Sequence, residues 1–313
     1  MNITVGIPVT RTKYLLQALQ SVAAQSIHVH EVIVVDNGAD NDVSALISQI
    51  PLPIRLIKRE HRLPPVENWN LLLAEVSSKW FILLSDDDYF APDHFAQLKQ
   101  ITDLRPDAMV LHTRVRLVNS DGIATALTPH APAWESAWDF LWHRSMGFRI
   151  QFLSDFAWNT AALRAVGGFA DLPSAWGTDD LTVFRVAQFG GIAFGARPTF
   201  NYRLHANSIS ASYSAEDKLV AIEMLMTEYK REVRQALAKF NDPGDVLVLN
   251  STLRTLPAFR YKLQKYVLSN VRLAGFLTLC FKGVFGVSPY KISTWSVVKV
   301  CIFNMVAFAK PRK

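Results

Sequence analysis

The stretch Trp80-Phe81-Ile82-Leu83-Leu84-Ser85-Asp86-Asp87-Asp88 joins an apolar run to three consecutive aspartates. Five apolar residues in succession predict a strand that is buried on both faces, as in a parallel sheet. In open α/β sheets, ligands collect outside the carboxyl ends of the strands. Carboxylates at such an end would bind a divalent cation, because hard cations prefer oxygen ligands. The alternative is a solvated acidic turn that only caps the helix expected from Pro92.

Strand and helix patterns alternate around this stretch. Apolar or β-branched runs predict strands at 3–8, 32–35, 54–57, 80–84, 109–118 and 192–204. Helical spacing predicts helices at 14–24, 42–50, 66–76, 134–144, 161–166 and 181–188. Continuous apolar strands joined by helices imply a mostly parallel sheet that is covered on both faces.

Composition limits the compartment and the class of partner. The 313 residues contain two cysteines, Cys280 and Cys301, which have neither a disulfide framework nor metal-ligand spacing. Residues 1–9 lack the features of a signal peptide, so we expect a cytoplasmic protein. Residues 246–313 contain 11 basic and no acidic residues, which leaves 22 basic and 27 acidic residues in 1–245. This asymmetry predicts a surface partner for the tail and argues against nucleic-acid binding.

The C-terminal part predicts a separate helical region. Residues 214–240 have the pattern of a long amphipathic helix, which Asn241-Asp242-Pro243-Gly244 would end. We therefore expect a domain at 1–213 and a helical extension at 214–313, basic and apolar from residue 246. Its apolar stretches are interrupted before the roughly 20 residues that a span requires. A helix lying on the membrane surface is expected, with a helical cap on the core or in a dimer interface as the alternative.

Short motifs follow the expected strands in a fixed order. They are Val5 to Arg11, Ser21 to Gln25, Val35 to Asp40, Asp86 to Asp88, Gly167-Gly168-Phe169, the Asp179-Asp180 pair and Tyr202 to His205. Their order resembles that of family 2 inverting nucleotide-sugar glycosyltransferases, in which these places read [IV]-x-[IV]-P-x-Y-N-R, S-x-x-x-Q, V-D-D/N-G-S-x-D, D-x-D, G-G-F, E-D and Y-R-x-H. The resemblance covers residues 1 to about 213. It implies the GT-A fold, a Rossmann-like, mostly parallel central sheet flanked by helices.

The resemblance also implies a divalent metal, Mn²⁺ or Mg²⁺. Asp87 would be the most direct ligand, with Asp88 beside it and Asp86 acting through ribose or water. His205 would complete the metal shell or touch phosphate, with a purely structural histidine as the alternative. Neither GxxxxGK[ST] nor a strand-linked GxGxxG occurs, so a diphosphate would be held through the metal.

The nucleotide would lie against the first two strand ends. The residues that the resemblance assigns to it are Pro8, Thr10, Arg11, Asp36, Asn37, Arg62 and Asp86. Two departures from the family pattern affect the base pocket: Val9-Thr10 replaces the Y-N pair, and Asn37 stands where many members have a second aspartate. UDP is the first choice of nucleotide, with dTDP and GDP open. A solvated charge is the alternative role for Arg62.

An acceptor hydroxyl must lose a proton as it attacks, and a carboxylate would serve as general base. The family's base is the aspartate of its E-D pair, which corresponds to Asp179 when counted back from Arg185 and to Asp180 when the pair is taken literally. Both aspartates would also favour the positive end of the helix that follows, which is the alternative role.

These inferences combine into one functional hypothesis. The chain would transfer a sugar, with UDP as the first choice of carrier, to a hydroxyl of a glycan or lipid-linked acceptor. The reaction would take place at the inner face of the cell membrane, in bacterial envelope polysaccharide or lipopolysaccharide synthesis. The alternatives are a sugar nucleotidyltransferase and a non-catalytic membrane-bound glycan-binding module. A homo-oligomer, formed by copies of this chain, is a further expected partner state.

Overall fold

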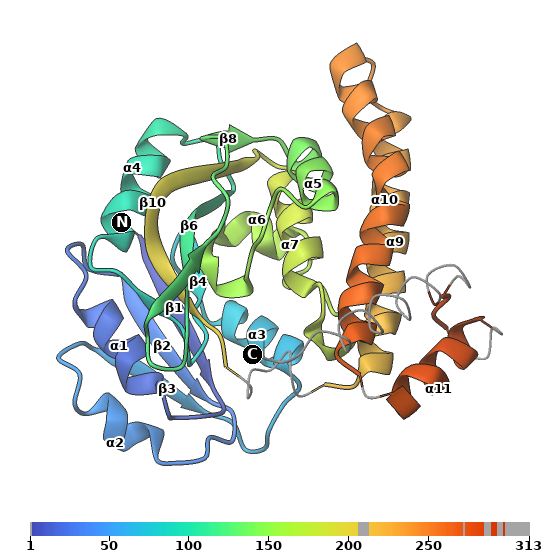
Figure 1. The fold of residues 1–313 in the computed structure, drawn as a ribbon. Helices are drawn as coiled ribbons and strands as arrows, with labels where there is room; N and C mark the ends of the chain where they lie inside the picture. The colour runs from blue at the N-terminus through green and yellow to red at the C-terminus, as the bar shows by residue number, and fades with distance from the viewer. Residues whose placement is uncertain (1, 206–212, 272, 285–288, 293–296, 298–313) are drawn as a thin grey trace. The chain divides into compact units, whose positions relative to one another are not determined.

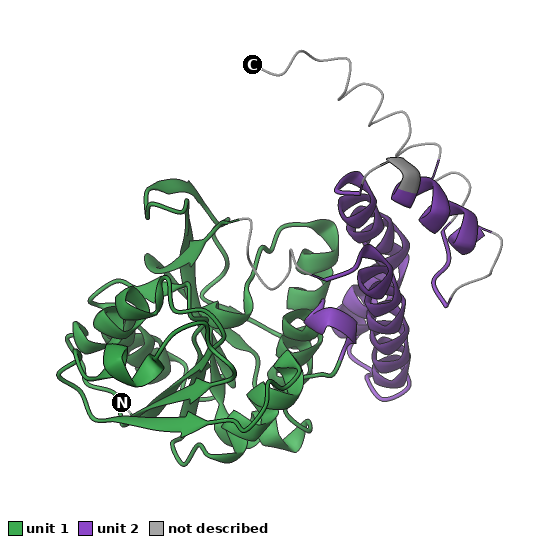
Figure 2. Cartoon of the chain, turned by 90° about the horizontal axis from the view of Figure 1, so that it is seen from below, with its two compact units in different colours: residues 1–171, 178–208 green, residues 172–177, 209–313 purple. Residues whose placement is uncertain are grey.

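The computed structural model describes residues 2–205, 213–271, 273–284, 289–292 and 297 (Figure 1). The chain divides into two compact units (Figure 2). Unit 1 consists of residues 1–171 and 178–208, and unit 2 consists of residues 172–177 and 209–313. The expected boundary after residue 213 lies near this division, and the assignment of catalysis to the first part stays a prediction.

Unit 1 is built on a mixed sheet of ten strands, in the order β3-β2-β1-β4-β9-β6-β10-β5, with β7 paired to β6 and β8 to β10. The strands are β1 Ile3–Val9, β2 Glu31–Asp36, β3 Ile54–Lys58, β4 Trp80–Leu83, β5 Tyr89–Phe90, β6 Val110–Val118, β7 Ala124–Leu127, β8 Trp134–Glu135, β9 Phe156–Asn159 and β10 Ile192–Arg203. Strands β3, β2, β1 and β4 are parallel. β9 is antiparallel to both β4 and β6.

Helices flank this sheet, as the sequence predicted (Figure 1). Those of unit 1 are α1 Leu15–Ala23, α2 Val43–Ile47, α3 Pro65–Ala74, α4 His94–Leu104, α5 Ala137–Met146, α6 Thr160–Ala165 and α7 Thr178–Ala187, with the 3-10 turn η1 Leu153–Asp155. Unit 2 contains the 3-10 turn η2 Pro173–Ala175 and the helices α9 Ala215–Leu237, α10 Pro243–Ser269 and α11 Leu273–Val284. The predicted α/β class with a helix-flanked central sheet is confirmed.

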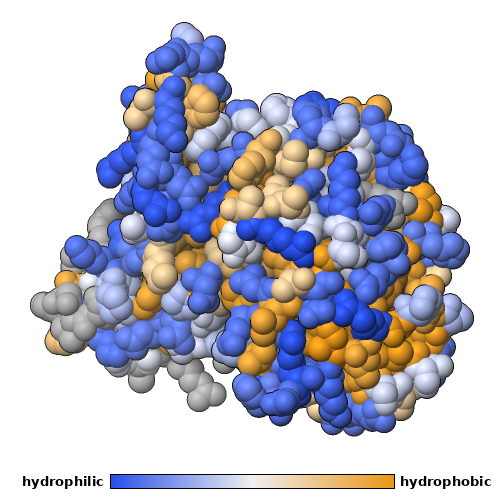
Figure 3. Space-filling model, turned by 180° about the vertical axis from the view of Figure 1, so that it is seen from behind, coloured by the Kyte–Doolittle hydropathy of each residue, from blue (hydrophilic) through white to orange (hydrophobic). Residues whose placement is uncertain are grey.

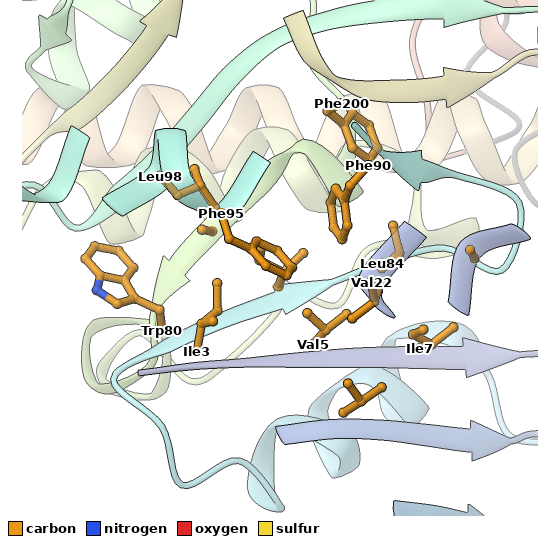
Figure 4. Close-up of a cluster of buried hydrophobic side chains, with 14 of the residues drawn as sticks. Ile3, Val5, Ile7, Val22, Trp80, Leu84, Phe90, Phe95, Leu98 and Phe200 are labelled. Carbon is orange, nitrogen blue, oxygen red and sulfur yellow. The ribbon is translucent and has the colours of Figure 1, made fainter. Parts of the chain in front are cut away.

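Hydrophobic side chains are buried on both faces of the sheet. On one face, β1 and the β4 strand pack against α1 and α4 (Figure 4). The labelled side chains there are Ile3, Val5, Ile7, Val22, Trp80, Leu84, Phe90, Phe95, Leu98 and Phe200. On the other face α3 approaches β1 closely, since a Cβ at Gly6 would lie 2.8 Å from both Leu72 and Phe81. This double coverage explains why the central strands read as continuous apolar runs.

Two elements differ from the sequence-based expectation. The helix expected at 134–144 begins later, because Trp134 and Glu135 pair with β10 as β8 before α5 starts. Strand β9 was not predicted, because its four residues run directly into α6. Its insertion between β4 and β6 makes the sheet more mixed than expected.

In unit 2, α9 and α10 lie side by side (Figure 2). Glu223 on α9 accepts hydrogen bonds from Arg260 and Gln264 on α10, at 2.7 and 3.0 Å. The sequence analysis did not predict α10 as one helix, because Pro257 interrupts its pattern. In the described part of the chain, no helix has the length and hydrophobicity needed to cross a membrane. The expected apolar segment at 292–309 falls almost wholly outside the described residues.

Candidate active site

The carboxyl ends of β1, β4 and β10 meet at one edge of the sheet. β5 follows the acidic triplet and pairs with β10 through Phe200 and Asn201. This pairing holds residues 85–88 beside the end of β10, where Arg203 and His205 lie. Segments more than a hundred residues apart in the sequence therefore form one polar site at the place where α/β sheets bind ligands.

Asp87 and His205 form the central contact of this site. Nε2 of His205 lies 2.7 Å from Oδ2 of Asp87, and both side chains are largely buried. Nη2 of Arg11 lies 3.6 Å from the same oxygen. Burial opposes ionisation of Asp87, but the hydrogen bonds from His205 and Ser85, together with the charges of His205 and Arg11, outweigh it and lower the pKa of this carboxyl. Asp87 is therefore a carboxylate at neutral pH.

Asp86 organises the loop that follows β1. Its Oδ2 accepts hydrogen bonds from the backbone N–H groups of Thr10 and Arg11, both at 3.0 Å. Burial and the neighbouring charge of Asp87 raise the pKa of Asp86 to about 6. This carboxyl therefore fixes the positions of Thr10 and Arg11 relative to Asp87.

Asp88 lies deepest in the triplet. Its Oδ1 accepts a hydrogen bond from the backbone N–H of Arg203 at 2.9 Å. Its Oδ2 is buried and has no hydrogen-bond partner among the described residues. Burial and then the charge of Asp87 raise the pKa of Asp88 well above its ordinary value, although hydrogen bonds from the backbone N–H of Arg203 and the hydroxyl of Ser154 oppose the shift. An unpaired buried oxygen of this kind is unfavourable unless a ligand or an ion meets it.

The side chains at this edge can be compared with the ligands that a divalent ion needs. In the part of the chain that the structure describes, no group of three or more metal-ligating side chains surrounds one point. Asp87 and His205 supply two adjacent ligand atoms, and Asp88 has a free oxygen nearby in the sequence. Mg²⁺ sites commonly use only one or two carboxylates and complete the shell with water and substrate phosphates. These residues fit a divalent ion that binds together with a diphosphate.

Arg203 is a structural residue of this edge. Its guanidinium donates to the carbonyl oxygens of Asp87, Asn119 and Ser120 at 3.0, 3.3 and 3.0 Å. It also donates to Oε1 of Gln17 at 2.6 Å. These bonds tie the acidic turn to the ends of β6 and β10, and they place Arg203 in a supporting role.

The predicted nucleotide residues gather at the ends of β1 and β2. Pro8 pairs with Val35 inside the sheet. Asp36 closes a turn by accepting from the backbone N–H of Ala39 at 2.9 Å. Thr10 lies beside Asp86, as described above.

Two other predicted nucleotide residues lie at the connection between β3 and α3. The side-chain amide of Asn37 is used in holding this connection, since it donates to the carbonyl of Leu63 and accepts from its N–H. Arg62 is exposed, and its Cβ lies 3.4 Å from where a Cβ of Gly38 would be. Asn37 thus fixes the backbone of Leu63, while Arg62 is exposed to solvent.

The two candidate bases at the start of α7 differ sharply in their surroundings. Asp180 is buried and accepts from Nε and Nη2 of Arg144 at 2.6 and 3.0 Å, and from Gln151 at 3.1 Å. Asp179 is half-buried, and the described residues give it no bonded cation. Burial and then the charge of Asp180 raise the pKa of Asp179 to about 7, with Arg144 opposing the shift. Arg144 thus balances the charge of Asp180, whereas burial and that same charge oppose the ionisation of Asp179.

A short segment that the sequence analysis did not single out connects the two halves of the site. Gln151 bonds to Asp180, and Oγ of Ser154 accepts from the backbone N–H of Ser85 at 3.1 Å. Asp155 ends this segment and is buried. A lone aspartate in the sequence Leu-Ser-Asp-Phe carries no motif, so only the antiparallel pairing of β9 with β4 reveals its position.

Comparison with known proteins establishes the family. The family model described as "Glycosyl transferase family 2" matches residues 4–170, more than half of the chain. The chain belongs to glycosyl transferase family 2. It is a glycosyltransferase with the GT-A fold, as the motif order predicted. No curated protein matches it.

Solved structures of two other transferases share this fold. TarS 1–349 of S. aureus in complex with UDP-GlcNAc superposes with a TM-score of 0.64 at 16% identity, covering 86% of this chain and 80% of TarS. The mannosyltransferase PcManGT of Pyrobaculum calidifontis in complex with GDP-Man and Mn²⁺ superposes with a TM-score of 0.57 at 14% identity, covering 99% and 81%. At this level of identity the likeness shows the fold alone.

Proposed function

We propose that the family 2 glycosyltransferase moves a sugar from a nucleotide donor to an acceptor hydroxyl by a metal-dependent, inverting reaction. The observation that carries this proposal is the separation of roles among the aspartates. Asp87 is paired with His205 at the strand ends, and Arg144 forms an ion pair with Asp180, whereas the described residues give Asp179 no ion pair. One side of the site can therefore meet a diphosphate, and the other can accept a proton.

A divalent ion, Mn²⁺ or Mg²⁺, would be held by Asp87 and His205, with Asp88 beside them. When bound, such an ion offsets the negative charge that develops on a departing diphosphate. The free Oδ2 of Asp88 and the small protein ligand set support this assignment. The Mn²⁺ bound to PcManGT, a protein of the same fold, agrees with it.

The nucleotide would occupy the ends of β1 and β2. Thr10 and Arg11 are held there by Asp86, and Nη2 of Arg11 lies 3.6 Å from an oxygen of Asp86 and from one of Asp87. An arginine at this place would bind phosphate through its planar donor fork. UDP is the favoured nucleotide, and the UDP-GlcNAc bound to TarS supports this choice. GDP is the alternative, because PcManGT binds GDP-Man.

In the transfer step, the carboxylate of Asp179 would take the proton of the acceptor hydroxyl. The acceptor oxygen would form a bond to the anomeric carbon while the bond from that carbon to the diphosphate oxygen breaks. The electron pair of the broken bond would leave with the nucleoside diphosphate, and attack from the opposite face would invert the anomeric configuration. A base with a pKa near the working pH is suited to this proton transfer.

The products test this function against the nucleotidyltransferase alternative. We expect release of a nucleoside diphosphate from the donor and no release of inorganic pyrophosphate. We also expect UDP with Mn²⁺ to raise the melting temperature of the chain by several degrees, because a ligand that binds only the folded state stabilises it. Thermal shift against UDP, dTDP and GDP, with and without Mn²⁺, measures this effect. No shift with any nucleotide, or release of pyrophosphate, would reject the proposal.

We also propose that the protein works at the inner face of the cell membrane, on a glycan or lipid-linked acceptor of envelope polysaccharide or lipopolysaccharide synthesis. The support is the basic, apolar chain from residue 246 and the surface of α11. Leu277 and Phe281 are one helical turn apart on α11 and are 56% and 60% exposed. On the face drawn in Figure 3, hydrophilic residues surround the hydrophobic patches, and this face does not indicate by itself where a membrane would bind. The residues expected to contact lipid are therefore those of α11 and the basic tail.

Vesicle binding tests the membrane proposal. We expect the chain to sediment with phosphatidylglycerol vesicles far more than with phosphatidylcholine vesicles, and less at high salt. Replacing Leu277 and Phe281 together by glutamate should reduce this binding about tenfold, since both apolar contacts are lost and negative charge is added. Leu104→Glu combined with Ile123→Glu, at two apolar residues of unit 1 that are 71% and 62% exposed, is the matched control and should bind as the wild type does. Equal binding by all three proteins would contradict the proposal.

A further inference from the structure

Asp155 is an unexplained carboxyl in the middle of the site. The whole residue is 2% exposed, and neither Oδ1 nor Oδ2 has a hydrogen-bond partner among the described residues. Leaving one buried polar group unpaired typically costs about 1–3 kcal/mol of stability. Burial therefore raises the pKa of Asp155 well above its ordinary value, with the charges of Asp179 and Asp88 adding to the shift. The backbone N–H of Phe152 opposes this shift but does not cancel it.

Its position is fixed by the backbone on both sides. The pairing of β9 with β4 ends at Ala157 and Ile82, and the bond between Ser154 and Ser85 carries the contact of the two segments onward. On the other side, Gln151 binds Asp180. The segment 151–155 thus runs from the two candidate bases, Asp179 and Asp180, to the acidic triplet. The charges that act on Asp155 come from one residue of each group, Asp179 and Asp88.

The unpaired atoms along this segment share one chemical property. They are oxygens of Asp88, Gln151 and Asp155, and all are buried acceptors. A group that donates hydrogen bonds is what they lack. Sugar hydroxyl groups are such donors, and a hydroxyl also accepts a hydrogen bond from a carboxyl that keeps its proton.

The proposed reaction places a sugar ring in this position. Its anomeric carbon must lie between the diphosphate, at Asp87 and Asp88, and the acceptor oxygen, at Asp179. We propose that Asp155 binds a hydroxyl group of the donor's sugar ring and is a specificity-determining residue of the enzyme. This inference rests on the proposed function and names a residue for its least defined part, the choice of sugar. Because the carboxyl oxygens are buried when no sugar nucleotide is bound, neighbouring side chains must move as the sugar enters.

The inference separates sugar binding from nucleotide binding. In Asp155→Ala, we expect the Kd of a sugar nucleotide to rise at least tenfold, while the Kd of the nucleoside diphosphate changes less than about twofold. Asp155→Asn retains a hydrogen-bond acceptor and a hydrogen-bond donor, so its affinity for the sugar nucleotide should fall less than about fivefold. Isothermal titration with UDP, UDP-GlcNAc, GDP and GDP-mannose, each with Mn²⁺, measures these constants.

Stability supplies a second, independent readout. If Asp155 serves a ligand, removing its unpaired carboxyl should leave the melting temperature of the free protein unchanged or raise it. Ser154→Ala is the matched control, because its hydroxyl bonds to Ser85 in the free protein. That variant should have a lower melting temperature than the wild type, and its affinities for UDP and for UDP-GlcNAc should fall by similar factors.

Each outcome has a defined meaning. Selective loss of sugar-nucleotide affinity with unchanged or raised stability supports the inference. Unchanged affinities, equal weakening of nucleotide and sugar nucleotide, or a lower melting temperature with unchanged affinities would overturn it and leave the proposed function intact. If the wild type binds neither nucleoside diphosphates nor sugar nucleotides, the proposed function itself fails and the inference falls with it.

Discussion

Replacing Asp179 by asparagine is expected to lower kcat for sugar transfer about a thousandfold while the Kd for the donor changes less than about threefold. The amide cannot take the acceptor proton, and general base catalysis contributes roughly 10² to 10⁴ to the rate. Donor affinity is retained because the amide has nearly the size of the carboxylate, and because the nucleotide would bind at the ends of β1 and β2 whereas Asp179 belongs to α7. Steady-state transfer and donor titration measure the two quantities separately.

The raised pKa of Asp179 also predicts how kcat/KM changes with pH. Since burial and Asp180 raise the pKa of Asp179 to about 7, its base form is lost as the pH falls through 7. We expect kcat/KM of the wild type to rise with pH and level off above about 8, and the asparagine variant to lose this limb. The charged groups that set the position of the limb are Asp180 and Arg144.

The same shift predicts a change in stability. The unfolded state ionises Asp179 from about pH 4 upward, whereas the folded state resists ionisation up to about pH 7, so this group destabilises the fold as the pH rises across that window. Asp179→Asn should therefore melt higher than the wild type at pH 8. Asp180→Asn is the matched control, and it should lose about 3 kcal/mol because Arg144 loses its partner. Transfer that survives in Asp179→Asn and vanishes in a folded Asp180→Asn would assign the base to Asp180.

Replacing Asp87 by alanine is the second large effect that we expect. Transfer should fall at least a thousandfold, because the diphosphate would lose the ion that offsets its developing charge. The stabilisation by UDP with Mn²⁺ should also disappear in a thermal shift experiment. His205 remains in this variant but is left with no carboxylate at 2.7 Å.

An exposed aspartate provides the control for the second prediction. Asp121 lies in the turn after β6, where its backbone N–H bonds to Asn119 and its side chain faces solvent. Asp121→Ala should retain both transfer and the Mn²⁺-dependent shift. Full turnover in Asp87→Ala at saturating donor would remove the metal role from the acidic triplet.

The sequence contained enough information to predict the fold. The run Trp80 to Leu84 became the fully buried β4, and the apolar runs at 3–8, 32–35 and 54–57 became its parallel neighbours. Local pattern succeeded for β1, β2 and β4 because strands buried on both faces must be apolar throughout, whereas the edge strand β3 is partly exposed. It failed for β9, since four residues that pass straight into α6 contain no recognisable period.

The site could be predicted only as far as its motifs reach. The neighbourhood of Asp87 and His205 followed from motif order, and the structure brings these two side chains together. The difference between Asp179 and Asp180 did not, because it depends on Arg144, which reaches α7 from a different helix. Asp155 was missed for the same reason: its significance comes from what it lacks in three dimensions.

The position of the metal is the most direct test of this account. Crystals grown with Mn²⁺ and UDP, measured at the manganese absorption edge, should show one anomalous peak within ligand distance of Oδ2 of Asp87 and Nε2 of His205, with the diphosphate on its far side. A bound UDP with no peak beside Asp87, or a peak at another part of the chain, would contradict the central claim.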